Sequence, residues 1–430
     1  MAPEVITLGC RLNIAESETI RAMLGGRDVI VVNSCAVTNE AVRATRAAIR
    51  KARRARPGSE LVVTGCAAQI DPTAFAAMPE VSRVVGNLDK LAVRHWTLPT
   101  PFGPAPSTAP GTNGAFARHA RAFVEVQNGC DHSCTFCAIP AGRGTSRSTP
   151  AGAVVDRIAA LVDAGHREVV LTGVDLTSYG HDLPGAPTLG SLVERILRFV
   201  PALPRLRMSS LDGIEIDARL FDLLTGEARV MPHVHLSLQA GDDMILKRMK
   251  RRHTRAQSVA LVARLKAARS DIAIGADLIA GFPTEDAAMF ANTLTLIEDC
   301  EIVHAHIFPY SARAGTPAAR MPQVAGDAIK TRAGLLRQRA AARRGAWLET
   351  LIGTEQRVLV EAPGDRGHAE NFAEVRLTPT QAVRPELVEG RVPGIPPGSS
   401  ASTSSARTVG EVACVRIASL SAGKLIGAIA

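Results

Sequence analysis

Six of the eight cysteines in this chain of 430 residues fall into two groups of three whose chemistry suits metal binding. The other two, Cys300 and Cys414, stand apart, and we expect them to be structural or incidental, because free cysteine usually behaves as a small hydrophobe. A chain of this length with reduced thiols does not need disulfides to fold, so metal binding is the leading explanation. The groups are Cys10, Cys35 and Cys66, here the strand triad, and Cys130, Cys134 and Cys137, here the loop triad.

The loop triad has a spacing that does not suit zinc. Its cysteines follow one another at intervals of four and three residues, whereas a zinc finger needs four ligands that often come in pairs. Thiolates also hold iron–sulfur clusters, and three thiolates leave one iron free for another ligand. The spacing therefore favours a [4Fe-4S] cluster with one open iron. His132 lies between the cysteines and could compete as a ligand, but we expect it to face solvent.

The strand triad follows three apolar segments that are typical of buried strands. Each cysteine ends a β-branched run such as 29–34 and precedes a stretch that favours helix. The cysteines are roughly 30 residues apart, the length of a strand–helix–strand unit, so the strands should be parallel. Their carboxyl ends then share the edge where open α/β sheets bind ligands. We expect a doubly wound α/β domain over residues 1–95 to gather these thiols into a second metal site.

Further along the chain, the pattern predicts two more domains. Residues 96–118, rich in Pro, Gly, Thr and Ser, are typical of a linker. Six strand–helix units over 119–350 then predict a parallel, partly closed barrel with its site at the carboxyl ends of the strands. Short alternating strands over 351–430 predict a small antiparallel β-barrel, with a disordered low-complexity insert at about 382–408. The barrel strands are expected at 123–127, 168–172, 205–209, 233–238, 272–279 and 302–308.

The charge of the chain favours a polyanionic partner such as nucleic acid. The formal net charge is +9 and aromatic residues make up only 3%, so phosphate contacts are expected rather than many stacked bases. A predicted helix over 43–56 carries seven cations and no acid, which indicates either an RNA contact or a solvated face. No apolar run reaches the roughly 18 residues that span a bilayer, and the N-terminus lacks a secretory signal. We therefore expect a cytoplasmic protein without a membrane span.

Several motifs resemble those of a known enzyme family. The loop triad at the start of a β/α barrel, with Phe136 before its last cysteine, resembles the radical S-adenosylmethionine enzymes, and the upstream strand triad narrows this to the methylthiotransferases. Arg11-Leu12 is similar to the threonylcarbamoyladenosine tRNA branch and departs from the branches that modify isopentenyladenosine or a ribosomal protein. The resemblance covers residues 3 to about 350, and its further motifs lie at 7–18, 32–38, 64–69, 85–90 and 143–148.

This resemblance implies a reaction and its cofactors. The loop triad would hold a [4Fe-4S] cluster that binds and reduces S-adenosylmethionine, and the strand triad would hold a second [4Fe-4S] cluster that provides sulfur. The product would be the 2-methylthio derivative of N6-threonylcarbamoyladenosine at position 37 of tRNA, with the anticodon stem-loop as partner and an unidentified electron donor and sulfur source. The C-terminal barrel would be an RNA-binding TRAM domain. The residues implied to contact S-adenosylmethionine are Phe136, Gly173, Ser209, Gln239 and Asp277.

Two classes of alternative remain open from the sequence. A methylthiotransferase that acts on isopentenyladenosine tRNA or on a ribosomal protein would share all six cysteines, and only the identity of the modified macromolecule separates it. A non-catalytic iron–sulfur sensor that binds RNA would need neither the barrel motif nor a cofactor pocket. The sensor hypothesis fails if the protein cleaves S-adenosylmethionine under reductant.

Overall fold

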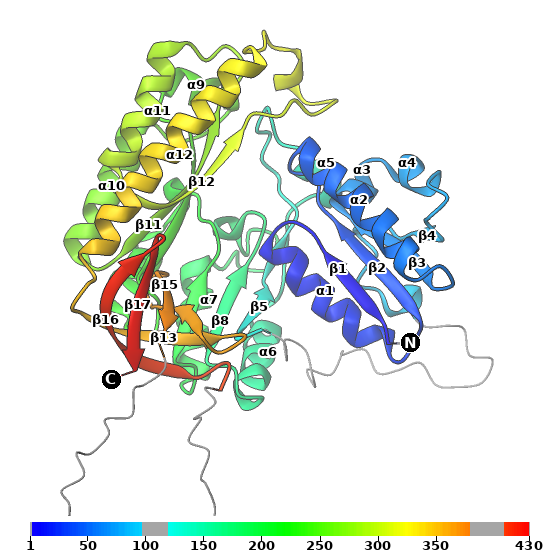
Figure 1. The fold of residues 1–430 in the computed structure, drawn as a ribbon, viewed down its shortest axis with the longest axis horizontal. Helices are drawn as coiled ribbons and strands as arrows, with labels where there is room; N and C mark the ends of the chain where they lie inside the picture. The colour runs from blue at the N-terminus through cyan, green and yellow to red at the C-terminus, as the bar shows by residue number, and fades with distance from the viewer. Residues whose placement is uncertain (1, 97–118, 379–407, 430) are drawn as a thin grey trace, which may run out of the picture.

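A computed structural model of the chain describes residues 2–96, 119–378 and 408–429 (Figure 1). The predicted linker lies outside the described residues from residue 97 onward, and so does the predicted low-complexity insert up to residue 407. Figure 1 shows an N-terminal sheet unit beside a larger strand–helix unit, with a small barrel packed against the latter.

The N-terminal unit is a parallel sheet in the order β1-β2-β3-β4 with helices on both faces. Strand β2 is buried along its whole length, because alternate side chains pack on opposite faces. Val31 packs with Ile20 of α1 on one face, and Val32 packs with Ile49 of α2 on the other. The doubly wound prediction is thereby confirmed. The elements are β1 (Glu4–Thr7), α1 (Arg11–Leu24), β2 (Val29–Ser34), α2 (Asn39–Ala55), β3 (Glu60–Gly65), α3 (Cys66–Ile70), α4 (Pro72–Ala76), β4 (Arg83–Val84) and η1 (Val93–His95).

The central unit is a partly closed barrel of six parallel strands, as the sequence predicts. Strands β5-β8-β9 form one sheet and β10-β11-β12 another, and a parallel bridge between Leu211 and Leu236 connects them. Among the described residues, no pairing joins β5 to β12, so the barrel stays open on one side. The strands are β5 (Arg121–Glu125), β8 (Glu168–Thr172), β9 (Arg205–Met208), β10 (His233–Gln239), β11 (Ala273–Ala280) and β12 (Ile302–Pro309), with a short pair of β6 (Gln127–Asn128) and β7 (Arg147–Ser148) beside them.

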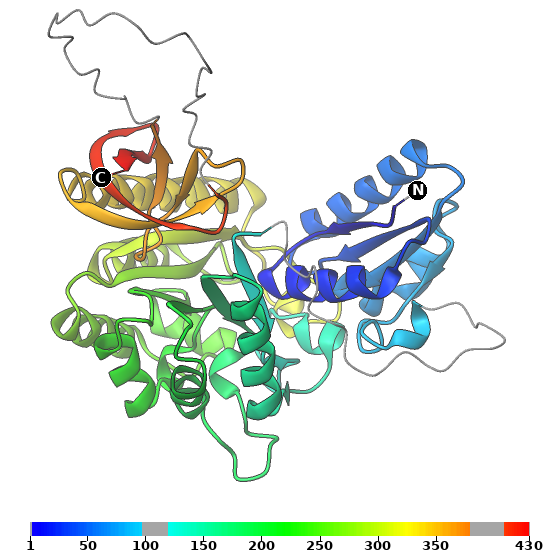
Figure 2. The same ribbon diagram turned by 90° about the horizontal axis from the view of Figure 1, so that it is seen from below.

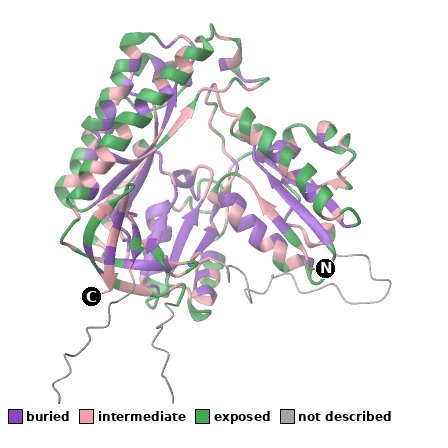
Figure 3. Cartoon of the chain, in the orientation of Figure 1, coloured by how far each residue is buried: buried purple, intermediate pink, exposed green. Residues whose placement is uncertain are grey.

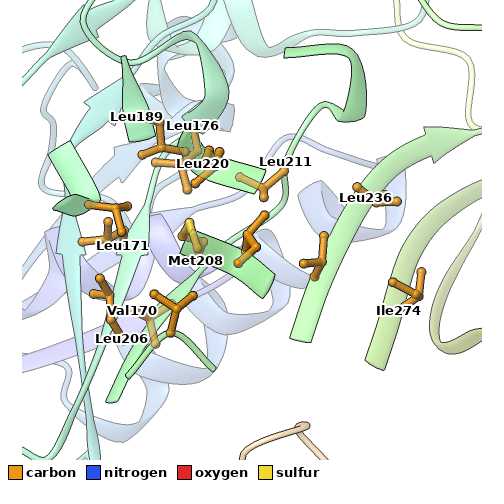
Figure 4. Packing of buried hydrophobic residues seen from close by; sticks show 14 of the residues in the cluster. Val170, Leu171, Leu176, Leu189, Leu206, Met208, Leu211, Leu220, Leu236 and Ile274 are labelled. Carbon is orange, nitrogen blue, oxygen red and sulfur yellow. The ribbon is translucent and has the colours of Figure 1, made fainter. Parts of the chain in front are cut away.

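Branched aliphatic side chains fill the space between this barrel and its helices (Figure 4). Figure 3 shows the purple buried strands with helices that are green on their outer faces. Some of the helices begin at side-chain caps: Thr188 caps α7, and Thr254 and Gln257 form a capping box at α10. The helices are α5 (Ile139–Arg143), α6 (Ala151–Asp163), η2 (Leu176–Ser178), α7 (Leu189–Phe199), η3 (Gly213–Glu215), α8 (Ala218–Gly226), α9 (Asp243–Met249), α10 (Arg255–Ala268), α11 (Ala287–Asp299), η4 (Pro317–Arg320) and α12 (Gly326–Glu349).

The C-terminal unit is a closed five-stranded barrel in the order β13-β14-β15-β17-β16 (Figure 2). The predicted antiparallel pairing holds for every pair except β15 with β17, which is parallel. A closed ring with an odd number of strands cannot alternate direction throughout, so one parallel pair is unavoidable. The strands are β13 (Glu355–Glu361), β14 (Arg366–His368), β15 (Glu374–Leu377), β16 (Val412–Ser421) and β17 (Lys424–Ile429).

A buried carboxylate at the start of β8 helps to fix the C-terminal barrel to the core. Glu168 is fully buried and forms ion pairs with Arg121 at 2.7 Å and Arg205 at 2.8 Å. Burial alone would raise the pKa of Glu168, but the surrounding arginine charges hold it far below its usual range. Arg121 also pairs with Glu361 of the C-terminal barrel, so one charge network spans both units.

Candidate metal and cofactor site

A cavity of about 710 Å³, here the cysteine cavity, lies where the N-terminal sheet meets the carboxyl ends of the barrel strands. It is lined by residues of both units, including the end of β12 and the start of α1. The structure brings every residue predicted for a site to this one cavity. They are Cys10, Cys35, Cys66, Cys130, Cys134, Cys137, Phe136, Gly173, Ser209, Gln239 and Asp277.

The strand triad sits on the turns that follow three neighbouring strands. Cys10 precedes α1, Cys35 follows β2, and Cys66 opens α3 after β3. Gly9 has a φ of +97°, and a Cβ atom there would lie 2.7 Å from Cys35 Sγ, so only glycine allows the two cysteine turns to approach. Burial raises the pKa of Cys35 and Cys66, and the neighbouring Cys10 raises both further. The three thiols therefore act on one another, as ligands of one metal group must.

The loop triad lies on a tight turn between β6 and α5. Gly129 has a φ of +75°, and a Cβ atom there would lie 1.8 Å from the Thr145 carbonyl oxygen. Burial raises the pKa of Cys130 to about 12 and that of Cys137 to about 11, and the neighbouring thiols add to both shifts. Three such thiols on one turn match the donor set of an iron–sulfur cluster.

Donors around the thiols also fit a cluster. The backbone N–H groups of His132 and Ile139 each lie 3.4 Å from a cysteine Sγ atom, and Arg251 lies 3.8 Å from Cys134 Sγ. On the strand triad, Asn87 Nδ2 lies 3.8 Å from Cys66 Sγ. Hydrogen bonds to sulfur stabilise the thiolate form and tune a bound cluster. Both triads thus have the donors and the surroundings that a [4Fe-4S] cluster requires.

Polar groups without partners mark the part of the cavity that lies above β8, β9 and β12. Ser209 Oγ, Thr172 Oγ1 and Tyr310 Oη are buried and have no hydrogen-bond partner within the described part of the chain, and all three residues line the cavity. A buried hydroxyl without a partner indicates a missing ligand. A Cβ atom at Gly173 would lie 2.9 Å from Gln127 Oε1, so the backbone there borders the cavity closely. This region has the donors that a polar cofactor needs.

The other predicted cofactor contacts have defined surroundings. Gln239 ends β10 in the left-handed region, with a φ of +68°, which directs the end of the strand into the cavity. Phe136 packs edge-on against Phe282, with ring centroids 6.4 Å apart. Asp277 accepts hydrogen bonds from His235 at 3.0 Å and His306 at 3.1 Å. Burial opposes the ionised form, but these two histidines hold the pKa of Asp277 well below its usual range.

A buried ion-pair network between the two triads was not among the predicted site residues. Glu16 of α1 pairs with Lys90 and with Arg143 of the central unit, the latter at 2.8 Å, and Arg143 also donates to Asn13 at 2.5 Å. Burial would raise the pKa of Glu16, but the two cations hold it at about 2. The sequence did carry a signal, because Asn13 and Glu16 are three residues apart and therefore share one face of the predicted helix.

His132 faces solvent only in part, since its side chain is 25% exposed and is paired with a carboxylate. Its Nε2 lies 2.8 Å from the Asp175 carboxylate, and the hydrogen bond to that carboxylate raises the pKa of His132. The Asp175 carboxylate also lies 3.7 Å from Cys130 Sγ. The sequence analysis missed this ion pair because Asp175 comes from the turn after β8, which the sequence alone does not place beside this loop.

Some of the cations on the predicted helix over 43–56 have partners in other segments of the fold. Arg56 pairs with Asp28, and Arg53 donates to the backbone oxygens of Glu80 and Ser59 at 2.7 to 2.9 Å. These partners come from neighbouring strands and loops, which the helix sequence does not show. On this helix, three exposed cations form no ion pair with any described residue. They are Arg43, Lys51 and Arg54.

The described part of the chain contains no helix that is both long and apolar enough to cross a membrane.

Comparisons with known proteins assign families to two parts of the chain. Residues 124–297 match the Radical SAM superfamily, and residues 3–86 match the Uncharacterized protein family UPF0004. The threonylcarbamoyladenosine tRNA methylthiotransferase MtaB of Rickettsia prowazekii is 46% identical over 92% of this chain and 96% of its own length. The protein of the same name from Thermotoga maritima is 32% identical over 83% of this chain and 85% of its own length.

The chain is also similar to a relative with a different printed activity and to a solved structure. A tRNA-2-methylthio-N(6)-dimethylallyladenosine synthase from Maricaulis maris is 32% identical over 84% of this chain and 87% of its own length. Among solved structures, a radical S-adenosylmethionine methyltransferase, TsrM, from Kitasatospora setae aligns with a TM-score of 0.51 at 16% identity, covering 74% of this chain and 77% of that one. This likeness supports the α/β fold of the chain and, at this identity, nothing beyond the fold.

Proposed function

The chain belongs to the MtaB-type threonylcarbamoyladenosine tRNA methylthiotransferases, which are radical S-adenosylmethionine enzymes, and from this premise we propose how its residues divide the work. The protein converts N6-threonylcarbamoyladenosine at position 37 of tRNA to its 2-methylthio derivative. One observation carries the division of labour: two cysteine triads from different units line a single cavity.

We infer that each triad holds a [4Fe-4S] cluster. Cys130, Cys134 and Cys137 would hold the one that binds S-adenosylmethionine, and the strand triad would hold the second. The target C2–H is an unactivated aromatic bond beyond side-chain acids, bases or nucleophiles, so cofactors must supply the chemistry. When bound, the two clusters and S-adenosylmethionine supply the electron, the radical and the sulfur.

The protein's own side chains bind and orient the cofactors and shield them from solvent. The unpartnered hydroxyls of Ser209, Thr172 and Tyr310 offer hydrogen bonds to S-adenosylmethionine, with Gly173 and Gln239 bordering the same space. Arg251 lies 3.8 Å from Cys134 Sγ and would place its positive charge beside a sulfur ligand of the bound cluster. The Glu16–Arg143 pair fixes the N-terminal unit against the central unit, and therefore fixes the strand triad relative to the loop triad.

The partners follow from the same reaction. We propose that the anticodon stem-loop of tRNA enters the cysteine cavity, with RNA-phosphate contacts on the C-terminal barrel and on the exposed cations of α2. An electron donor and a sulfur source act from outside the chain. Reduced thiols and a tRNA substrate support a cytoplasmic location. We divide the chain into units at 1–95, 119–350 and 351–430, with the cysteine cavity between the first two.

The test is product analysis with defined RNA. Anaerobically reconstituted protein is incubated with S-adenosylmethionine, reductant and stem-loops that carry threonylcarbamoyladenosine, isopentenyladenosine or adenosine at position 37. Mass spectrometry of the digested nucleosides should show the methylthio product on threonylcarbamoyladenosine alone. A product on isopentenyladenosine or on a ribosomal protein instead would contradict the substrate, and the absence of deoxyadenosine would contradict the enzyme class.

A further inference from the structure

A second cavity of about 460 Å³, here the basic cavity, adjoins the cysteine cavity along the edge of β12. The two cavities share Arg11, His235 and His306. No Asp or Glu lines the basic cavity, and Asp277 reaches its histidines only from the side of the cysteine cavity. Its polar and aromatic lining consists of Arg11, Arg337, Arg344, His233, His235, His304, His306 and Phe372.

One cation in this lining has no partner of its own. Arg337 and Arg344 donate to backbone oxygens of β12. Arg11, in contrast, forms no hydrogen bond and no ion pair with any described residue, and its guanidinium lies 5.4 Å from the centre of the Phe372 ring. Glu168 and Asp277 attract Arg11 only from beyond ion-pair distance, so an anion bound directly to this half-buried cation would offset the cost of its burial.

A buried histidine in the lining of the basic cavity also has no hydrogen-bond partner among the described residues. His233 is 3% exposed, and neither of its ring nitrogens has a hydrogen-bond partner among the described residues. Burial and the neighbouring His304 and Arg207 lower its pKa well below the usual value, so the ring is neutral and has one N–H to donate. Buried polar groups in native proteins are normally paired, which indicates that a ligand completes this site.

The C-terminal barrel contributes an aromatic ring, that of Phe372, which contacts both His233 and Arg11. Phe372, in the loop between β14 and β15, has a φ of +69°, a region that bulky residues rarely adopt. Its ring stacks on His233 at 5.0 Å and on His368 at 4.6 Å. Backbone strain of this kind is typical of ligand sites. The basic cavity is thus assembled from all three units of the protein.

We propose that the basic cavity binds an anionic oxygen group of the tRNA substrate, and that this group is the carboxylate of the threonyl moiety of threonylcarbamoyladenosine. The inference rests on the proposed function. A guanidinium binds carboxylate with paired hydrogen bonds. C2 and the N6 substituent belong to the same six-membered ring of the base. When C2 faces the cysteine cavity, the N6 group therefore reaches an adjoining space, and Arg11 borders both cavities.

The assignment explains selection between modified adenosines. Isopentenyladenosine has no carboxylate and would leave Arg11 and His233 without a partner in a closed complex, which is the kind of mismatch that discriminates strongly. A backbone phosphate of the stem-loop offers the same oxygen chemistry, so the test must separate the two sources.

The test measures binding by the cluster-loaded protein in the absence of reductant. Fluorescence anisotropy compares three stem-loops that carry adenosine, threonylcarbamoyladenosine or its methyl ester at position 37. The wild-type protein should bind the free acid at least about tenfold more tightly than the ester. Arg11→Gln should remove most of this preference, and His233→Phe should reduce it several-fold, while both leave the affinity for the unmodified stem-loop within about twofold.

Arg339→Gln is the matched control, because Arg339 lies on α12 but pairs with Glu298 outside the basic cavity. It should keep the full preference for the acid. Iron content is measured for every variant, and since Arg11 adjoins Cys10, His233→Phe decides the outcome if Arg11→Gln loses iron.

Three results would contradict the proposal in distinguishable ways. If the variants lose affinity equally for all three stem-loops, the cavity binds a backbone phosphate and the carboxylate assignment is wrong. If iron-loaded variants keep the wild-type preference, the cavity does not bind the substrate's anion. If the wild-type protein neither prefers threonylcarbamoyladenosine nor methylthiolates it, the proposed function itself fails.

Discussion

The two cysteine triads reach one cavity by different structural routes. The loop triad lies on a single turn between β6 and α5, and all three of its thiols are half-buried. The strand triad joins the ends of three strands, with Cys35 and Cys66 buried and Cys10 exposed. The first arrangement depends on local backbone geometry, whereas the second depends on the parallel order of β1, β2 and β3. Damage to the N-terminal sheet should therefore affect only the second.

The triads are nevertheless coupled through a buried connection. Glu16 lies six residues after Cys10 and pairs with Arg143, six residues after Cys137. Both side chains are 1% exposed. This pair gives the two triads a fixed separation, so we expect it to affect the transfer step without belonging to either metal site.

The largest effect should come from the loop triad. Cys134→Ala should reduce the cleavage of S-adenosylmethionine to background, because the redox cluster proposed for the loop triad would lose one ligand, while iron should remain bound at the strand triad. Deoxyadenosine is quantified by chromatography under reductant. Cys414→Ala is the control, since Cys414 is exposed and does not line the cavity. Deoxyadenosine at the wild-type level in Cys134→Ala would remove the loop triad from the reaction.

A substitution in the strand triad tests the role of that triad separately from the role of the loop triad. Cys35→Ala should still form deoxyadenosine but yield no methylthio product, because the cluster that we propose supplies the sulfur would lose one of its ligands. Both compounds are measured in the same reaction with a threonylcarbamoyladenosine stem-loop. Methylthio product from this variant would show that the strand triad has no part in the transfer.

The buried network of Glu16 with Lys90 and Arg143 should contribute strongly to the free energy of unfolding. Glu16→Gln leaves Lys90 and Arg143 buried with no ion-pair partner among the described residues, so we expect the free energy of unfolding to fall by about 3–5 kcal/mol. Urea unfolding of the anaerobic protein measures this change. Glu194→Gln removes an exposed pair with Arg219 and should cost less than about 1 kcal/mol. Equal effects of the two substitutions would show that the buried network does not hold the units together.

Acid should weaken the same connection. The pKa of Glu16 is held at about 2, below its ordinary value of 4.5, so its contribution to stability is complete above pH 4.5 and declines as pH falls toward 2. Thermal unfolding of the wild-type protein should therefore show a steeper fall of Tm over this window than that of Glu16→Gln. Parallel pH profiles would rule out a role for Glu16 ionisation.

The smallest effect concerns RNA affinity. Joint replacement of Arg43, Lys51 and Arg54 by Gln should lower the log–log salt dependence of tRNA binding by roughly 0.7–0.9 for each phosphate that the helix no longer neutralises. Arg53→Gln is the informative comparison, because Arg53 is occupied by backbone oxygens and should alter stability rather than salt dependence. An unchanged log–log salt dependence in the triple variant would show that this face of the helix is solvated and does not contact tRNA.

The sequence predicted the parts of the site that depend on local spacing and on strand order. The loop triad was visible in its intervals, and the strand triad followed from three buried strands that each end in cysteine. The ion pair of His132 with Asp175 and the partners of Arg53 were missed, because both depend on segments that meet only in the folded chain. The parallel pair of β15 and β17 was missed for a topological reason, since strand patterns do not show how a barrel closes.

The most direct test of the account is nucleoside mass spectrometry of tRNA from a strain that lacks this gene and is complemented with the wild-type protein, Cys35→Ala or Cys134→Ala. The account predicts that 2-methylthio-threonylcarbamoyladenosine is absent from the deletion strain and returns only with the wild-type protein, while threonylcarbamoyladenosine accumulates otherwise. If the methylthio nucleoside persists without the gene, or returns with either variant, the claim that two cysteine triads serve one transfer reaction is contradicted.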